Sequence, residues 1–225
     1  MPPPQYSAEL QACQLHFRIK PCRYPVADTW GLLPVAGPEE RLDCTALDTV
    51  SIDNASTKDI DDALSFAFTG DGFELPCSLG IHVADVASRL PCASPLFLWA
   101  RERGGSAYHS GVGGEEAQGG GSVPMLPPEL AHGELSLNEG VPRNAVSLFL
   151  EVDEQGQVTR RWHARTRIVN DEATSYDAFD GDEENALFVA GRQLLRKLSG
   201  ADEADEMVAW WRVAAASNPH PSLAL

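Results

Sequence analysis

The chain has 225 residues, and 43% of them are hydrophobic, enough for a globular core in one large domain or two small ones. Its 17 Lys and Arg residues stand against 33 Asp and Glu residues, so the formal net charge is −16. This charge argues against a free-standing nucleic-acid binder, which usually carries a basic patch, and the lack of an 18-residue apolar run argues against a membrane span.

The first residues, MPPPQYSAEL, contain neither the basic segment nor the apolar segment of a secretory signal. The five cysteines are scattered and form no CxxC pair: Cys13, Cys22, Cys44, Cys77 and Cys92. This pattern favours free thiols in a reducing compartment over a zinc site or a disulfide framework. We therefore expect a cytoplasmic protein.

The first half of the chain predicts an irregular arm followed by strands. Residues 1–40 are rich in proline and turn formers, and the strand-like patterns begin after Arg41. The predicted strands are Leu47–Asp53, Ala63–Phe68 and Leu75–Val86, the last two as a hairpin around the turn at Thr69–Gly72. Ser94–Arg103 predicts a short helix that ends at Gly104 and Gly105.

The second half predicts a loop, two strands and then helices. Residues 110–122, SGVGGEEAQGGGS, have the composition of a flexible loop. Ala145–Val152 and Gln157–Val169 predict a strand pair, with Trp162, Ala164, Thr166 and Ile168 on one face of the second strand and Arg161, His163, Arg165 and Arg167 on the other. Residues 184–200 and 202–216 have helical spacing. The order predicts an α+β fold, a mixed or antiparallel sheet with helices packed on it.

Four aspartates lie within ten positions between two of the predicted strands: Asp53, Asp59, Asp61 and Asp62. Their spacing, D-x5-D-x-D-D, does not fit a calcium-binding EF-hand loop in either register. A few clustered carboxylates suit Mg²⁺, which completes its octahedron with water and substrate phosphate. The competing interpretation is a solvated acidic loop. Spacing alone does not separate the two, but the flanking apolar strands favour a site at the end of a core sheet.

At these residues the sequence becomes similar to a known family. RLDCTALDTVSIDNASTKDIDDALSF resembles the signature of the ribonuclease II / ribonuclease R family, in its RNB catalytic domain. Further segments match in the same order: LGIHVADVA (79–87), RGGSAY (103–108), VPMLPPEL (123–130), LSLNEGVPR (135–143) and SYDAF (175–179). The resemblance covers residues 41–180 and identifies a partial RNB-like domain over 41–216, after an arm at 1–40 and before an irregular tail at 217–225.

The resemblance implies a Mg²⁺-dependent enzyme that hydrolyses single-stranded RNA in the 3′-to-5′ direction, with no DNA substrate expected. Carried over by position, Asp53, Asp59, Asp61 and Asp62 bind the metal. Asp61 and Asp59 are the catalytic residues that the resemblance implies, and Asp61 is the one most closely tied to the chemical step. Tyr108 matches an aromatic residue that stacks on a base near the 3′ end, although an isolated tyrosine is more often an ordinary half-buried side chain.

Other polar residues receive structural interpretations. We expect His82 and Asp85 to be structural, and the Arg161, Arg165 and Arg167 face to be solvated rather than bound to phosphates.

The chain also departs from the family pattern. The later Ser-Pro-x-Arg-Arg-Tyr element, whose arginine helps to hold the reacting phosphate, is absent, as are the OB-type RNA-binding modules. We therefore expect an incomplete catalytic domain. One alternative is a truncated, non-catalytic RNB-like protein that binds RNA or a protein partner. A weaker alternative is a non-nucleolytic metal phosphohydrolase that uses the same carboxylates.

Overall fold

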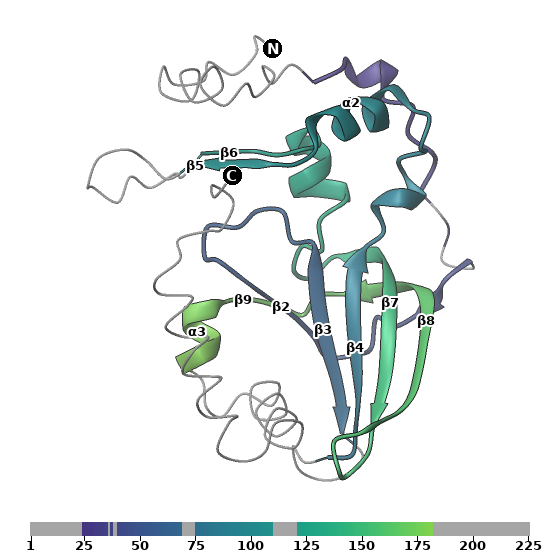
Figure 1. Cartoon of the computed structure of the whole chain (residues 1–225), viewed down its shortest axis with the longest axis vertical. Helices are drawn as coiled ribbons and strands as arrows, with labels where there is room; N and C mark the ends of the chain where they lie inside the picture. Colours follow the sequence, from purple (N-terminus) through teal and green to yellow (C-terminus); the bar gives the residue numbers. More distant parts are fainter. Residues whose placement is uncertain (1–23, 36, 38–39, 69–74, 110–120, 182–225) are drawn as a thin grey trace. The chain divides into compact units, whose positions relative to one another are not determined.

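The computed structural model describes residues 24–35, 37, 40–68, 75–109 and 121–181 (Figure 1). The chain divides into two compact units. The first comprises Met1–Val35 and Val86–Glu134, and the second comprises Ala36–Asp85 and Leu135–Leu225. Within the described ranges, no helix is long and apolar enough to cross a membrane.

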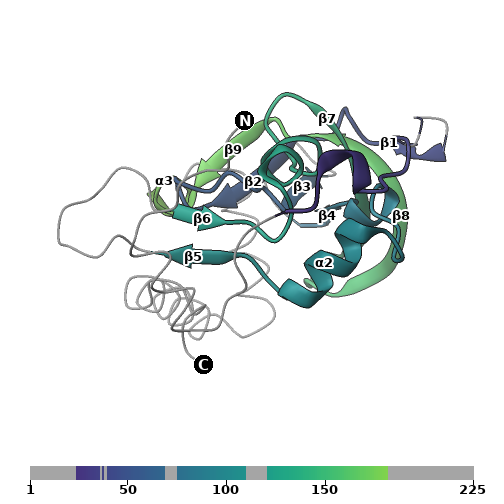
Figure 2. The same ribbon diagram turned by 90° about the horizontal axis from the view of Figure 1, so that it is seen from above.

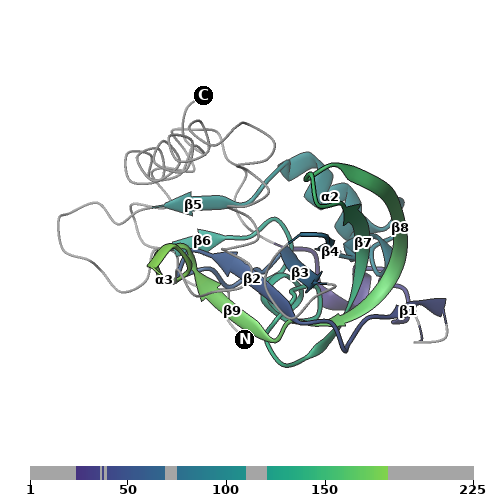
Figure 3. The same cartoon turned by 90° about the horizontal axis from the view of Figure 1, so that it is seen from below.

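The second unit is built on a seven-stranded mixed sheet with the strand order β1-β8-β7-β4-β3-β2-β9. Its strands are β1 (Leu42–Asp43), β2 (Thr49–Asp53), β3 (Asp62–Phe68), β4 (Cys77–Ala84), β7 (Pro142–Val152), β8 (Val158–Val169) and β9 (Glu172–Ser175). Neighbours from β2 to β8 are antiparallel, whereas β1 pairs in parallel with β8, and β9 pairs in parallel with β2. β8 follows a long curve when the sheet is seen from above or below (Figures 2 and 3).

The alternation of side chains along β8 confirms the predicted two faces. Trp162, Ala164, Thr166 and Ile168 are buried or half-buried, whereas Arg161, His163 and Arg165 are exposed and Arg167 is half-buried. The inner face contributes to one hydrophobic cluster of buried residues: Cys44, Ile60, Ala63, Leu137, Ala145, Phe149 and Ile168. The strand pairs 63–86 and 145–169 are likewise confirmed as the antiparallel ladders β3–β4 and β7–β8.

A row of buried polar side chains crosses the same sheet. Ser65 Oγ and His82 Nε2 are hydrogen-bonded at 2.9 Å, and His82 Nδ1 and Ser147 Oγ at 2.7 Å. Ser147 Oγ in turn lies 2.6 Å from Thr166 Oγ1. Gly80 makes room for this row, because a Cβ there would lie 2.4 Å from Ser65 Oγ.

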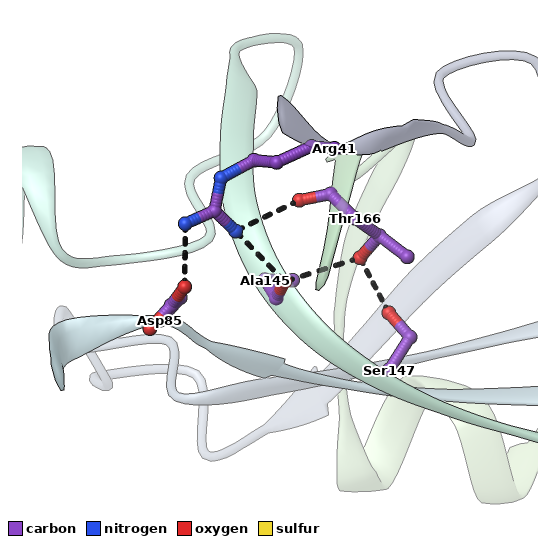
Figure 4. A network of polar contacts seen from close by, with 5 residues as sticks. All are labelled: Arg41, Asp85, Ala145, Ser147 and Thr166. Carbon is purple, nitrogen blue, oxygen red and sulfur yellow. Dashed lines mark hydrogen bonds and ion pairs between the residues drawn. The ribbon is translucent and has the colours of Figure 1, made fainter. Parts of the chain in front are cut away.

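The row continues to a buried ion pair (Figure 4). Arg41 Nη2 donates to Asp85 Oδ2 at 2.5 Å, and the two side chains are only 1% and 4% exposed. Arg41 Nη1 donates to the carbonyl oxygens of Ala145 and Thr166, at 3.2 and 3.4 Å. His82 and Asp85 are therefore structural residues, as predicted.

In its described residues the first unit contains α2 (Pro95–Arg103), the two-stranded ribbon of β5 (Ala107–His109) and β6 (Gly121–Val123), and three short helical segments. These segments are η1 (Ala27–Thr29), η3 (Val86–Ser88) and the π-helical η4 (Leu130–Glu134). α2 begins where predicted, because the Ser94 side chain accepts a hydrogen bond from the Phe97 amide. It ends where predicted, because Gly104 adopts a left-handed conformation with φ 80°.

Aromatic and ionic contacts hold the first unit together. The rings of Tyr24 and Trp99 lie 4.9 Å apart, and the Tyr24 hydroxyl donates to the carbonyl oxygen of Pro124 at 2.7 Å. Arg89 forms an ion pair with Glu134. Residues 24–35 of the predicted arm therefore belong to a packed unit and carry the helical turn η1.

The expected fold class is confirmed for the mixed sheet and only loosely supported for its helices. In the described part of the second unit the helix is α3 (Tyr176–Gly181), and the predicted helices at 184–200 and 202–216 lie outside the described residues, as does the turn at 69–72. The predicted loop 110–122 is wrong at its end, because Gly121–Val123 forms β6. Strand pairing needs only backbone groups, so a glycine-rich composition does not prevent it.

Candidate metal and active site

The four aspartates lie on the connection between two neighbouring strands of the second unit. Asp53 is the last residue of β2 and Asp62 is the first residue of β3, so the intervening loop places Asp59 and Asp61 between them. Ile60, which lies between these two acids, is only 7% exposed and belongs to the hydrophobic cluster. This anchor ties the acidic loop to the core, which is the arrangement expected of a site at the end of a core sheet.

The ionisation of Asp53 and Asp61 is perturbed by their surroundings. The pKa of Asp53 is raised to about 6, first by desolvation and then by the negative charges of Asp62, Asp61 and Asp59. The pKa of Asp61 is also raised, first by desolvation and then by Asp59 and Asp62. Partial burial and like charge both oppose ionisation here, so the loop concentrates negative charge that a cation would relieve.

Tyr176 is a neighbour of the acids that sequence reasoning missed. Its pKa is raised by desolvation and then by Asp53 and Asp62. The reason is the parallel pairing of β9 with β2, which sets Ser175 opposite Asp53 and starts α3 one residue later. The motif SYDAF marked this segment, but the sequence carried no signal that β9 pairs beside the acidic loop.

The donor set fits a hard divalent cation in its chemistry. Mg²⁺ prefers carboxylate and water oxygens, and such an ion would neutralise the neighbouring charges that, after desolvation, raise the pKa of Asp53. The side chains as they stand do not enclose an ion. Within the part of the chain that is described, no three His, Cys, Asp or Glu side chains are grouped to hold a metal. The loop thus supplies suitable ligand groups, but the described side chains do not form a complete coordination site.

Backbone hydrogen bonds hold the loop on both sides of Ile60. The Ile60 amide donates to Ser136 Oγ, and the Ile60 carbonyl oxygen accepts from the Leu137 amide, both at 2.9 Å. The Ala84 amide at the end of β4 donates to the carbonyl oxygen of Asp61, also at 2.9 Å. Residues distant in sequence therefore fix the main chain that carries Asp59 and Asp61.

Tyr108, the remaining predicted site residue, belongs to the first unit. Its backbone is the centre of β5 and pairs with Ser122 of β6, while its side chain lies outside what the structure describes. The role predicted for Tyr108 in base stacking therefore stays a prediction.

The family model for the RNB domain matches residues 41–186. The chain belongs to the RNB-domain ribonuclease family. Among its relatives, the human 3′-5′ exoribonuclease HELZ2 is 34% identical over 172 residues, which make up 75% of this chain and 5% of HELZ2. This RNB-domain chain therefore corresponds to a small part of that relative.

Solved structures share the fold. RNase R of Mycoplasma genitalium, in complex with ribose-methylated single-stranded RNA, matches with a TM-score of 0.66 and 23% identity, over 84% of this chain and 30% of RNase R. Yeast Ssd1, described as a pseudonuclease, matches with a TM-score of 0.62 and 20% identity, over 77% of this chain and 21% of Ssd1. The same RNB fold thus occurs in a ribonuclease and in a pseudonuclease.

Proposed function

We propose that this chain is a Mg²⁺-dependent 3′-to-5′ exoribonuclease of the ribonuclease II type, or the metal-binding half of one, acting on single-stranded RNA and releasing 5′-mononucleotides. The observation that carries the proposal is the cluster of four carboxylates on the β2–β3 loop of an RNB fold, two of which have raised pKa values. A cytoplasmic location stays part of the proposal, on the pattern of scattered cysteines.

The chain's own residues have defined tasks in this proposal. Asp53, Asp59, Asp61 and Asp62 would hold the ion, and the anchored Ile60 backbone keeps Asp59 and Asp61 on the same loop. When bound, such an ion supplies Lewis-acid stabilisation of the charge that develops on a reacting phosphodiester. Tyr176 stands beside Asp53 and Asp62, and Tyr108 would stack on a base, a sequence-tolerant contact suited to a nonspecific exonuclease.

The test is degradation of a 3′-labelled single-stranded RNA by the 225-residue chain with Mg²⁺. We expect labelled mononucleotides from the wild type, none in EDTA, and a loss of at least about 10²-fold in rate for Asp61→Asn, as for other groups that stabilise transition-state charge. Asp48→Asn is the matched control, because Asp48 is an exposed aspartate just before β2. A wild type without Mg²⁺-dependent product, or an Asp61→Asn variant as fast as the wild type, would contradict the proposal.

A second candidate is a non-catalytic RNB-like protein that binds RNA or a protein partner. Two observations favour it: the described acidic side chains do not form a metal-holding group, and the fold is shared with a pseudonuclease. This candidate predicts retention of a single-stranded RNA in a gel-shift assay, with equal affinity in Mg²⁺ and EDTA and no product. A single-stranded DNA of the same sequence should remain intact under both candidates.

A further inference from the structure

The loop that carries Asp59 and Asp61 is attached to the segment Leu135–Asn138 by hydrogen bonds to both backbone groups of one residue. The Ile60 amide donates to Ser136 Oγ and the Ile60 carbonyl oxygen accepts from the Leu137 amide, each at 2.9 Å. Of these two bonds, only the first depends on a side chain, so Ser136 is the position where a substitution removes the attachment without altering the main chain.

Ser136 is built into the core of the second unit. Its exposure is 0%, and its carbonyl oxygen accepts a hydrogen bond from Arg143 Nε at 2.8 Å. Two acceptors lie within hydrogen-bond distance of Ser136 Oγ: Asn138 Oδ1 at 3.1 Å and the Lys58 carbonyl oxygen at 3.4 Å. A hydroxyl has one proton, so it donates to one of these while accepting from Ile60. The side chain therefore contacts the loop backbone at residues on both sides of Asp59.

We propose that Ser136 is a positioning residue of the candidate site, which fixes the backbone between Asp59 and Asp61 and thereby the separation of these two carboxylates. The structural part of this inference rests on the hydrogen bonds above, and its catalytic consequence rests on the proposed function. Reactions that depend on placed groups are sensitive to small shifts, because a displacement of about 1 Å can lower a rate by about 10²-fold. Ser136 touches no reacting atom and acts through the loop.

Two variants distinguish a positioning role from a general structural one. Ser136→Ala leaves the buried Ile60 amide without its acceptor, so the loop should open more often. Ser147→Ala is the matched control, because Ser147 is also 0% exposed and hydrogen-bonded on both sides, to His82 and Thr166, on the sheet rather than on the loop. The two substitutions should lower the overall stability by similar amounts and differ in what they do to the acidic loop.

The first measurement is amide hydrogen exchange of peptides that cover residues 54–62. We expect exchange in Ser136→Ala to be about 10-fold faster there than in the wild type, and unchanged in Ser147→Ala, because local opening reports the bonds that are lost. Equal exchange in the two variants would overturn the inference. Ser136→Cys is the second variant, because sulfur is a weak acceptor in the same place, and it decides by the same criterion if Ser136→Ala does not fold.

The second measurement is the apparent affinity for Mn²⁺, followed by electron paramagnetic resonance, together with the RNA assay above. Ser136→Ala should weaken Mn²⁺ binding and lower kcat about 10-fold at unchanged KM, whereas Ser147→Ala should change neither. If loop exchange rises but Mn²⁺ affinity and kcat do not change, Ser136 is only structural and the proposal fails. If the wild type does not cleave RNA, the proposed function fails, and loop exchange and Mn²⁺ affinity still decide the role of Ser136.

Discussion

Two groups of polar residues belong to the second unit: the acidic loop between β2 and β3, and the row of buried polar side chains across the sheet. Charge is concentrated in the first group and paired in the second. On the β2–β3 loop, desolvation and then the neighbouring carboxylates raise the pKa of Asp61 and raise that of Asp53 to about 6. Across the middle of the sheet, the row from Ser65 through His82, Ser147 and Thr166 is paired side chain to side chain. At its end the Arg41 charge meets the Asp85 charge.

This difference distinguishes polar residues that stabilise the fold from polar residues that do not. Buried polar groups are tolerated when their hydrogen bonds are satisfied, and the row from Ser65 to Thr166 meets this condition, whereas the buried Nε of Arg41 at its end has no partner among the described residues. Carboxylates that lie close together destabilise a fold when they are ionised. We therefore interpret the acidic loop as a functional feature that uses its negative charge. Removing a charge should therefore lower the free energy of unfolding in the polar row and raise it in the acidic loop.

The largest expected effect concerns the buried ion pair. Arg41→Met leaves the buried Asp85 carboxylate without its guanidinium, and we expect a loss of about 3–5 kcal/mol in the free energy of unfolding, measured with urea. Arg160→Met is the matched control. Its partner pair with Glu151 is exposed, so the loss should be about 0–1 kcal/mol. If Arg41→Met were as mild as the control, Arg41 would not stabilise the row.

The second prediction concerns pH. Burial lowers the pKa of His82 to about 4, while an unfolded histidine titrates near 6.5. The unfolded state therefore takes up a proton first, so stability should fall as pH drops from about 6.5 towards 4, by up to about 2–3 kcal/mol. His82→Gln cannot titrate, so the difference between wild type and variant in urea unfolding across this range isolates the contribution of His82.

A flat difference across that range would mean that His82 is already protonated or exposed in the folded protein. The groups that contact the His82 ring in the described part of the chain include the Ser65 and Ser147 hydroxyls and the edge-on ring of Phe149, whose centroid is 5.9 Å away, and these three are neutral. No facing charge of this set supports an imidazolium, which is why burial controls the shift.

Local patterns predicted much of this structure. Apolar runs and the turn between them located β3 and β4, period-two alternation located β7 and β8, and the Ser94–Pro95 start with the Gly104 stop located α2. These features depend on residues close together in the chain. The acidic loop was also predicted from the sequence, because its four aspartates lie within ten positions between two apolar strands.

The parts that sequence did not predict depend on distant partners. β9 is four residues long and was missed, since its pairing with β2 joins residues more than 100 positions apart. The same is true of two contacts at the acidic loop. Tyr176 lies near Asp53, and Ser136 accepts a hydrogen bond from the Ile60 amide, but neither contact is indicated by residues that are neighbours in the sequence. For the Arg41–Asp85 ion pair, the sequence predicted that Asp85 is structural but did not identify Arg41 as its partner.

The smallest expected effect tests the acidic side of the contrast. In the folded protein the pKa of Asp53 is about 6, above the value of 3.8 for a free side chain, so ionised Asp53 destabilises the fold at neutral pH. In EDTA at pH 7, Asp53→Asn should therefore raise the free energy of unfolding, by no more than about 1 kcal/mol because the group is partly solvated. Near pH 3, where the carboxyl is protonated in both states, the gain should disappear.

The same variant links this destabilisation to cation binding. Mg²⁺ should raise the Tm of the wild type, because an ion that binds only the folded state stabilises it, and should raise the Tm of Asp53→Asn less. Asp48→Asn, at an exposed position outside the cluster, should shift stability by less than about 0.5 kcal/mol and keep the full response to Mg²⁺. An Asp53→Asn protein less stable than the wild type in EDTA would show that this carboxylate makes a stabilising contact, and that the acidic loop resembles the polar row.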